Sequence, residues 1–266
     1  MPAPEPFEVY AIRYAQHMRK ASENFLGGDL HDGPMPIDYY IWAIVGSQGT
    51  FILDTGFDQA AAEKRGRKLL NSPADSLQAI GIKASAVKDV IISHMHYDHA
   101  GNHGLFPNAR YHVQDREMAY CTGRCMCHRA MSHAFEVDDV IAMTRRVFAG
   151  NVQFHDGVEE IAPGLTLHHV GGHTMGLQVA RVWTRRGWVV LASDAVHFYA
   201  NMNEGRPFPI IYNVGDMLNA YGTIQKLASS ADHIIPGHDP LVLQRYPVAR
   251  PGLENVIVRL DVDPAK

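Results

Sequence analysis

Four side chains that can bind a metal ion lie within six residues, in the segment His94-Met95-His96-Tyr97-Asp98-His99. Neutral imidazoles and carboxylates are ligands that zinc and similar borderline metals take in proteins. The segment follows the apolar run 89–93, which is typical of a short buried strand, so it predicts a loop at the carboxyl end of that strand. Ligands of open α/β folds bind at this edge. His94 and His96 can point the same way from extended chain, whereas Asp98 and His99 begin a turn and point elsewhere, so one loop offers two ligand pairs.

Three more candidate ligands each follow a predicted strand. His173 comes after the run 165–170 and two glycines, Asp194 after the run 188–193, and His238 after Ile234-Ile235-Pro236-Gly237. Any one of them alone would more often be a turn residue or a hydrogen-bonded polar residue. All three follow a predicted strand, as the first cluster does. The sequence therefore predicts that they form one metal-binding set with it.

This set resembles the hallmark of the metallo-β-lactamase superfamily, which is His-x-His-x-Asp-His followed by a lone His, an Asp and a last His. The resemblance extends from the strand before Asp54 to the segment around His238. Leu53-Asp54-Thr55-Gly56 matches the early Asp-x-Gly element of the superfamily, whose carboxylate supports the metal loops from behind. The fold that the resemblance implies is of the α/β class (α+β in some schemes), a four-layer αβ/βα sandwich with two metal ions at its edge.

The resemblance also assigns the ligands. One ion would bind His94, His96 and His173, the other would bind Asp98, His99 and His238, and Asp194 would bridge them. Two neighbouring cations share a hydroxide, lower its pKa and polarise an incoming carbonyl oxygen, so Asp98 and Asp194 serve catalysis as well as metal binding. Zinc is the expected metal, although manganese, cobalt and iron accept the same ligands. True β-lactamases tend to differ at the position of Asp194 and flavin-linked diiron relatives at that of His96, so the pattern is that of a dinuclear hydrolase.

Within the superfamily, the chain most resembles the N-acyl homoserine lactonases, in its compact length, its ligand set and the segment 33–37 before a strand. That resemblance implies a small lactone or ester as substrate, either an N-acyl homoserine lactone, in quorum quenching, or a related catabolic lactone. In that family a tyrosine shortly after the bridging Asp assists ring opening. Here His197 stands three residues beyond Asp194, and Tyr199 follows. Either side chain can donate a hydrogen bond to a developing oxyanion, and we favour His197.

Two alternatives have different chemistry. A thioesterase like glyoxalase II has the same ligand set, but we expect it to carry basic residues for glutathione carboxylates near the site, and Arg181 and Lys226 are isolated. A mononuclear iron oxygenase related to persulfide dioxygenases would use fewer ligands. Retention of Asp98, His99 and His238 weighs against this oxygenase.

Composition agrees with one enzyme domain over residues 1–266, because 46% of the residues are hydrophobic. The 24 basic and 28 acidic residues give a net charge of −4, and the main basic run is Lys64-Arg65-Gly66-Arg67-Lys68, inside a helix predicted over 59–70. We expect this run to be a solvated helix face, so nucleic acid is not an expected partner.

The apolar runs, the segment 1–6 and the cysteines lead us to expect a cytoplasmic protein. No apolar run reaches the ~18 residues of a membrane span, and the segment 1–6 lacks the charged start and apolar core of a signal peptide. The three cysteines at 121, 125 and 127 are too close together and odd in number for a disulfide framework. A structural metal at these cysteines is the alternative, but buried or free thiols are expected.

The region at about 115–150 predicts a helical insertion near the mouth of the site, where it would help to select the substrate. Its apolar residues are spaced to line one helix face: Val137, Val140, Ile141, Met143 and Val147. A glycine-rich loop over 25–34 could cover the site or contact a second copy of the chain. Since relatives are often dimers, a homodimer is one expectation.

Overall fold

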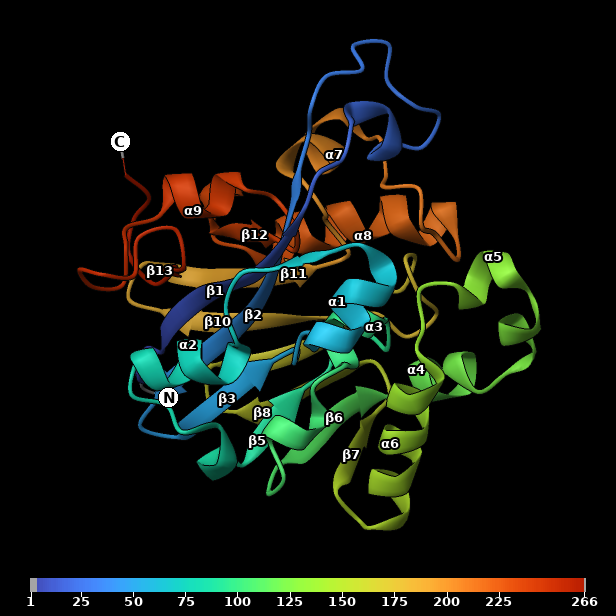
Figure 1. Cartoon of the computed structure of the whole chain (residues 1–266). Helices are drawn as coiled ribbons and strands as arrows, with labels where there is room; N and C mark the ends of the chain where they lie inside the picture. The colour runs from blue at the N-terminus through green and yellow to red at the C-terminus, as the bar shows by residue number, and fades with distance from the viewer. Residues whose placement is uncertain (1–3, 266) are drawn as a thin grey trace.

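Two β-sheets face each other and carry helices on their outer faces (Figure 1). The computed structural model describes residues 4–265, so Met1–Ala3 of the N-terminal segment considered above lie outside the described residues. The first sheet has the order β13 (Ile257–Arg259), β1 (Glu8–His17), β2 (Ile37–Gly46), β3 (Gly49–Leu53), β5 (Asp89–Ile91), β6 (Arg110–Gln114) and β7 (Val152–His155), and β4 (Lys68–Leu69) pairs with β1. The second has the order β12 (Ile234–Pro236), β11 (Gly187–Ser193), β10 (Gln178–Thr184), β9 (Leu165–His169) and β8 (Val158–Ala162).

The helices form the outer layers. On the first sheet lie α1 (Gln59–Arg65), α2 (Pro73–Ala79), α3 (Tyr97–Ala100) and α6 (Val137–Phe148), and on the second sheet lie α7 (Tyr199–Glu204) and α8 (Val214–Leu227). The remaining helices are α4 (Asp115–Cys121), α5 (Arg129–Ser132) and α9 (Leu241–Arg245), with short 3₁₀ turns at η1 (Ala21–Glu23), η2 (Ala84–Ala86), η3 (His103–Leu105), η4 (Arg124–Cys127) and η5 (Ala231–His233). This is the αβ/βα sandwich that the resemblance implied.

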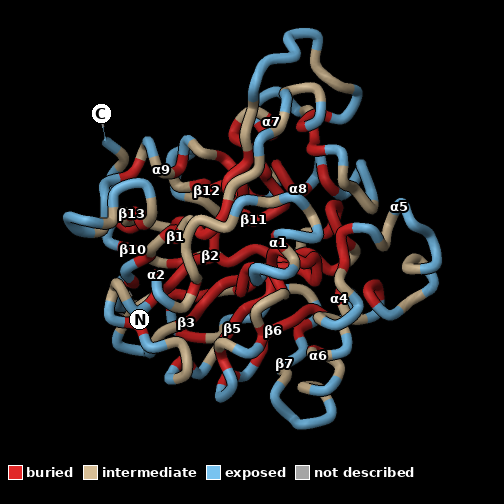
Figure 2. Tube along the Cα trace, viewed as in Figure 1, coloured by how far each residue is buried: buried red, intermediate tan, exposed pale blue. Residues whose placement is uncertain are grey.

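The layers arise because successive side chains along each strand point to opposite faces of the sheet. In β2 the residues Tyr39, Ile41 and Ala43 pack against the helices, whereas their neighbours Tyr40, Trp42 and Ile44 pack between the sheets. In β11 the inner residues Val189 and Leu191 alternate with Val190 and Ala192, which pack against α8. Because both faces of these strands are covered, their sequences are almost continuously apolar. Figure 2 shows the buried residues concentrated along the sheets.

Two expectations about helices need correction. Helix α1 ends at Arg65, not at residue 70, because Gly66 adopts a left-handed conformation with φ of 64° and the chain continues into β4. The insertion is helical in pieces, α4, η4, α5 and α6, and of its predicted apolar face only Met143 is buried, while Val137 and Ile141 are exposed.

The cysteines are free thiols, as expected: Cys121 is buried, Cys125 is half-buried and Cys127 is exposed. They belong to none of the groups of metal-binding side chains found in residues 4–265. Within the same residues, no helix is both long and apolar enough to cross a membrane.

Candidate metal centre

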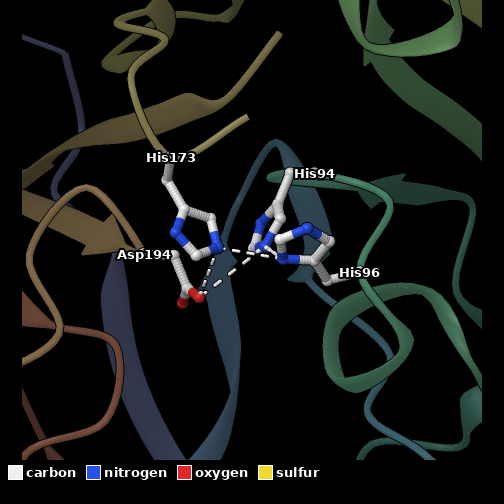
Figure 3. Close-up of side chains that lie close together, drawn as sticks. All are labelled: His94, His96, His173 and Asp194. Atoms are coloured by element: carbon white, nitrogen blue, oxygen red, sulfur yellow. Dashed lines mark hydrogen bonds and ion pairs between the residues drawn. The ribbon is translucent and has the colours of Figure 1, made fainter. Parts of the chain in front are cut away.

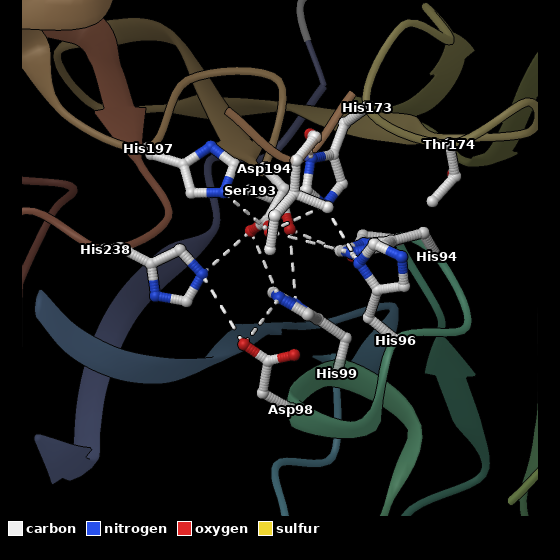
Figure 4. A network of polar contacts seen from close by, with 12 residues as sticks. His94, His96, Asp98, His99, His173, Thr174, Ser193, Asp194, His197 and His238 are labelled. Carbon is white, nitrogen blue, oxygen red and sulfur yellow. Dashed lines mark hydrogen bonds and ion pairs between the residues drawn. The ribbon is translucent and has the colours of Figure 1, made fainter. Parts of the chain in front are cut away.

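The ends of four strands bring all seven predicted ligands together at one edge of the sandwich (Figure 4). The loop after β5 supplies two histidines, and α3, which follows it directly, supplies an aspartate and a histidine. The loops after β9, β11 and β12 supply one residue each. The seven buried residues are His94, His96, Asp98, His99, His173, Asp194 and His238.

A first group of four atoms converges on one point (Figure 3). His96 Nδ1 lies 3.0 Å from His94 Nε2 and 2.9 Å from His173 Nε2. Asp194 Oδ2 lies 3.1 Å from His173 Nε2 and 3.6 Å from His94 Nε2. Three imidazole nitrogens and one carboxylate oxygen at this spacing provide the four ligands of a tetrahedral site.

A second group lies on the other side of Asp194. Asp194 Oδ1 is 3.1 Å from His99 Nε2 and 3.0 Å from His238 Nε2. Asp98 Oδ2 completes this group at 3.6 Å and 3.7 Å from the same two nitrogens. The two carboxylate oxygens of Asp194 therefore face different groups, which is the position of a bridging ligand.

The donor atoms fit two metal ions. His99 Nε2 and Asp194 Oδ1 are buried without a hydrogen-bond partner, and such atoms are rare in folded proteins unless a bound ion or water satisfies them. Burial, with the charges of neighbouring histidines, holds the pKa values of His94 and His96 well below the usual range. These two imidazoles are therefore neutral, which is the form that binds a metal.

A buried carboxylate orients His99. Asp54 Oδ2 lies 2.8 Å from His99 Nδ1, and Asp54 Oδ1 accepts a hydrogen bond of 2.7 Å from the backbone N–H of Ser93. Asp54 itself has a φ of 63°, a conformation that costs energy for a residue other than glycine. Asp54 thus contacts the metal loops from behind, as the resemblance implied.

Backbone carbonyls fix two more imidazoles. His173 Nδ1 donates to the carbonyl of Ile210 at 2.6 Å, and His238 Nδ1 donates to that of Asp38 at 2.8 Å. With Nδ1 protonated, Nε2 of each ring keeps a free lone pair that faces Asp194.

Glu117 of α4 is a structural residue of the site that the sequence did not identify. Its buried carboxylate accepts hydrogen bonds from the backbone N–H of Met95 at 2.7 Å, the hydroxyl of Thr174 at 2.7 Å and the backbone N–H of Gly176 at 3.0 Å. Glu117 therefore ties the first metal loop to the loop that carries His173. A lone glutamate in a helix has no spacing that marks such a role; the only local sign is Gly176, where a Cβ would lie 2.1 Å from Glu117 N.

His197 lies beside the bridging carboxylate. Its Nε2 is 3.1 Å from Asp194 Oδ2, its ring stacks on Phe208 with centroids 3.8 Å apart, and its Nδ1 is buried without a partner. Burial lowers the pKa of His197 to about 3 against the opposing effect of Asp194, so the imidazole is neutral. The structure thus brings this candidate to the centre.

Tyr199, the other candidate, is not brought there, and this expectation needs correction. Its ring packs in the core between the sheets, with the guanidinium of Arg245 4.0 Å above it. It is not among the residues that line the cavity at the metal centre. The reason is local: Phe198 is the extended N-cap residue of α7 and Tyr199 begins the helix, so residues 197 and 199 point in different directions.

A cavity of about 250 Å³ opens onto the metal centre. Its wall includes Arg19, Arg65 and Arg67, the last two from the basic run that we expected to be a solvated helix face. His133 and Ala134 also line it, so the segment at about 115–150 reaches the site. The expectation that only the isolated Arg181 and Lys226 could serve a thioesterase is therefore wrong, because three other arginines line the cavity.

A family model described as the Metallo-beta-lactamase superfamily matches residues 36–246. The chain belongs to this superfamily. Among curated proteins, this metallo-beta-lactamase superfamily chain is similar to an N-acyl homoserine lactonase of Bacillus sp., with 26% identity over 198 residues, 68% of this chain and 71% of that protein. It is also similar to N-acyl homoserine lactonase AttM of Azorhizobium caulinodans, with 50% identity over 185 residues and 62% of each chain covered.

Solved structures of the superfamily show the same fold. A quorum-quenching N-acyl homoserine lactone lactonase has a TM-score of 0.71 at 22% identity, with 90% of this chain and 94% of that chain covered. The dizinc quorum-quenching lactonase AidC has a TM-score of 0.69 at 16% identity, with 90% of each chain covered.

Proposed function

We propose that the protein is a dinuclear metal-dependent hydrolase that opens the ring of a lactone. The observation that carries this proposal is the position of Asp194, whose two oxygens face two separate groups of metal-binding atoms. The names of the similar proteins support N-acyl homoserine lactones, or related catabolic lactones, as the substrate class.

In this proposal His94, His96 and His173 hold one ion, Asp98, His99 and His238 hold the other, and Asp194 bridges. When bound, two divalent ions supply an activated water nucleophile and a Lewis acid. Zinc suits the imidazole and carboxylate donors and is the metal that we propose. In the overall reaction water adds to the carbonyl carbon, the ring C–O bond breaks, and a hydroxycarboxylate and one proton form.

His197 is the catalytic residue that we propose besides the ligands. It lines the cavity, and its neutral ring offers an N–H next to Asp194, where the reacting oxygen atoms would lie. A donor fixed there stabilises the charge that develops on the substrate oxygen. The stack on Phe208 holds the ring in place.

A second candidate is a thioesterase that acts on an acidic thioester. Arg19 and Arg67 of the cavity wall favour it, because guanidinium groups bind carboxylates. Both candidates use the same ligands. They differ in the bond that is hydrolysed.

We also propose that residues 1–266 form a single domain, that the insertion at about 115–150 belongs to it, and that the substrate is a small molecule, not a nucleic acid. A homodimer and a cytoplasmic location stay predictions.

An acid-release assay on a panel of lactones and thioesters, with and without chelator, tests the proposal. We expect chelator-sensitive release from lactones and a rate at least a hundredfold lower for the Asp194→Ala variant. Release from thioesters alone would favour the second candidate. Release that survives chelation would contradict both.

A further inference from the structure

Two arginines from separate segments line the cavity at the metal centre. Arg19 follows β1 and Arg67 precedes β4, and these two strands pair antiparallel, with Gln16 opposite Lys68. Both side chains are half-buried and line the same cavity as His96, Asp194 and the other centre residues. The pairing of β4 with β1 therefore places two guanidinium groups beside the reaction site.

Neither guanidinium forms an ion pair within residues 4–265. Arg67 donates to the hydroxyl of Tyr97 at 3.1 Å and to the carbonyl of Arg65 at 2.7 Å, and Arg19 donates to the carbonyl of Glu23. The Nε of Arg19 is buried without any hydrogen-bond partner.

Arg65, on the same wall, differs from these two arginines. Its guanidinium is paired with Glu136 at 2.7 Å. Arg65 therefore has a carboxylate partner, which it shares with Lys64, whereas Arg19 and Arg67 have none among residues 4–265.

The positive charges of Arg19 and Arg67 affect the pKa values of nearby groups. Burial, and then the charge of Arg67 and Arg19, lowers the pKa of His17. Burial and the charge of Arg67 likewise lower the pKa of Arg19, against the opposing charge of Glu23. Against the effect of burial, Tyr39, Tyr97 and Asp98 favour the charged form of Arg67 and raise its pKa. A partly desolvated guanidinium that forms no ion pair is costly unless an anion binds it.

We infer that Arg19 and Arg67 bind a carboxylate of the substrate, in addition to the carbonyl group that is hydrolysed. This inference rests on the proposed function and narrows its substrate to a compact lactone or ester with a free carboxylate, which fits the related catabolic lactones and not the N-acyl homoserine lactones, since these carry no carboxylate. Guanidinium groups match the planar carboxylate through parallel N–H donors. The cavity of about 250 Å³ is smaller than the roughly 300–1,000 Å³ of typical ligand sites, so it suits a compact substrate better than an enclosed long acyl chain.

The test compares γ-butyrolactone γ-carboxylate with its primary carboxamide, which has the same ring and no charge. The metal-loaded protein is assayed for kcat/KM on both compounds, and by titration calorimetry for Kd on any compound that is not turned over. We expect the carboxylate to be preferred by about tenfold or more, the effect of a charge-assisted hydrogen bond. Arg19→Gln and Arg67→Gln should each lower this ratio about tenfold. Arg67→Lys should retain only part of it, because an ammonium keeps the charge but lacks the parallel N–H donors.

Lys64→Gln is the matched control. Lys64 belongs to the same basic run, but its exposed side chain pairs with Glu136 and does not line the cavity. Its ratio and its rates should equal those of the wild type. Equal preference for the two compounds, or a preference that survives both Arg→Gln variants because the metal ions alone cause it, would overturn the inference. Binding that shows the preference without turnover would leave the inference standing and count against the proposed lactonase activity.

Discussion

Asp54 Oδ2 lies 2.8 Å from His99 Nδ1, so a buried carboxylate after β3 orients an imidazole of α3 toward Asp194. We predict that Asp54→Asn lowers the affinity of the second group of ligands for its metal about 10- to 100-fold, because the partner of a ligating histidine fixes its ring and raises its basicity. Competition with a chromophoric chelator measures this affinity. Asp75→Asn, at an exposed position of α2, is the control. Unchanged affinity in Asp54→Asn would show that this contact does not support the metal.

His197→Ala should lower kcat/KM on the order of a hundredfold, because one oxyanion donor is lost. Tyr199→Phe is the informative comparison: its hydroxyl is buried away from the cavity, so the rate should stay within about twofold of the wild type. Steady-state kinetics on one lactone measure both variants. The opposite order of effects would restore Tyr199 as the catalytic residue and exclude His197.

Glu117→Gln should destabilise the protein by roughly 1–3 kcal/mol, because an amide nitrogen would replace one of two oxygens that face three donors, leaving a buried donor unsatisfied. Urea unfolding of the metal-free protein measures the free energy of unfolding. We also expect weaker metal binding, since Glu117 joins two metal loops. If neither quantity changes, Glu117 does not hold the loops together.

The stability of the fold should depend on pH through Asp139. Burial first, and then the charges of Glu136, Asp58 and Asp138, raise the pKa of the Asp139 carboxyl to about 7. The folded state therefore holds a proton that the unfolded chain, with a pKa of about 3.9, releases, and stability from this group is lost as pH rises from about 4 to about 7.

Asp139→Asn should accordingly raise the free energy of unfolding at pH 8 by on the order of 1 kcal/mol, a figure reduced for partial exposure to solvent. The gain should be smaller at pH 5, where the wild-type carboxyl is protonated when folded. Thermal unfolding at the two pH values measures the difference. A gain that is equal at both pH values would mean that the substitution acts by some other route.

The convergence of the seven candidate ligands was predictable from sequence because each lies in a loop or short helix that follows an apolar strand, and strand ends meet at one edge of a sandwich. His94 and His173 are examples. The contacts of Glu117, Arg19 and Arg67 were not predictable, because they depend on which segments pack together. The sequence predicts a helix over 59–70, with Arg67 on its solvated face. The left-handed Gly66 instead ends α1 and turns the chain toward β1, which places Arg67 in the cavity wall.

The central claim, two cooperating metal ions bridged by Asp194, is tested most directly by adding zinc in steps to chelator-treated protein while lactone opening is measured. We predict that activity rises until two ions are bound per chain and then stays constant, and that Asp194→Ala never reaches this activity. Full activity with one ion bound, or one iron per chain with consumption of oxygen, would contradict the account.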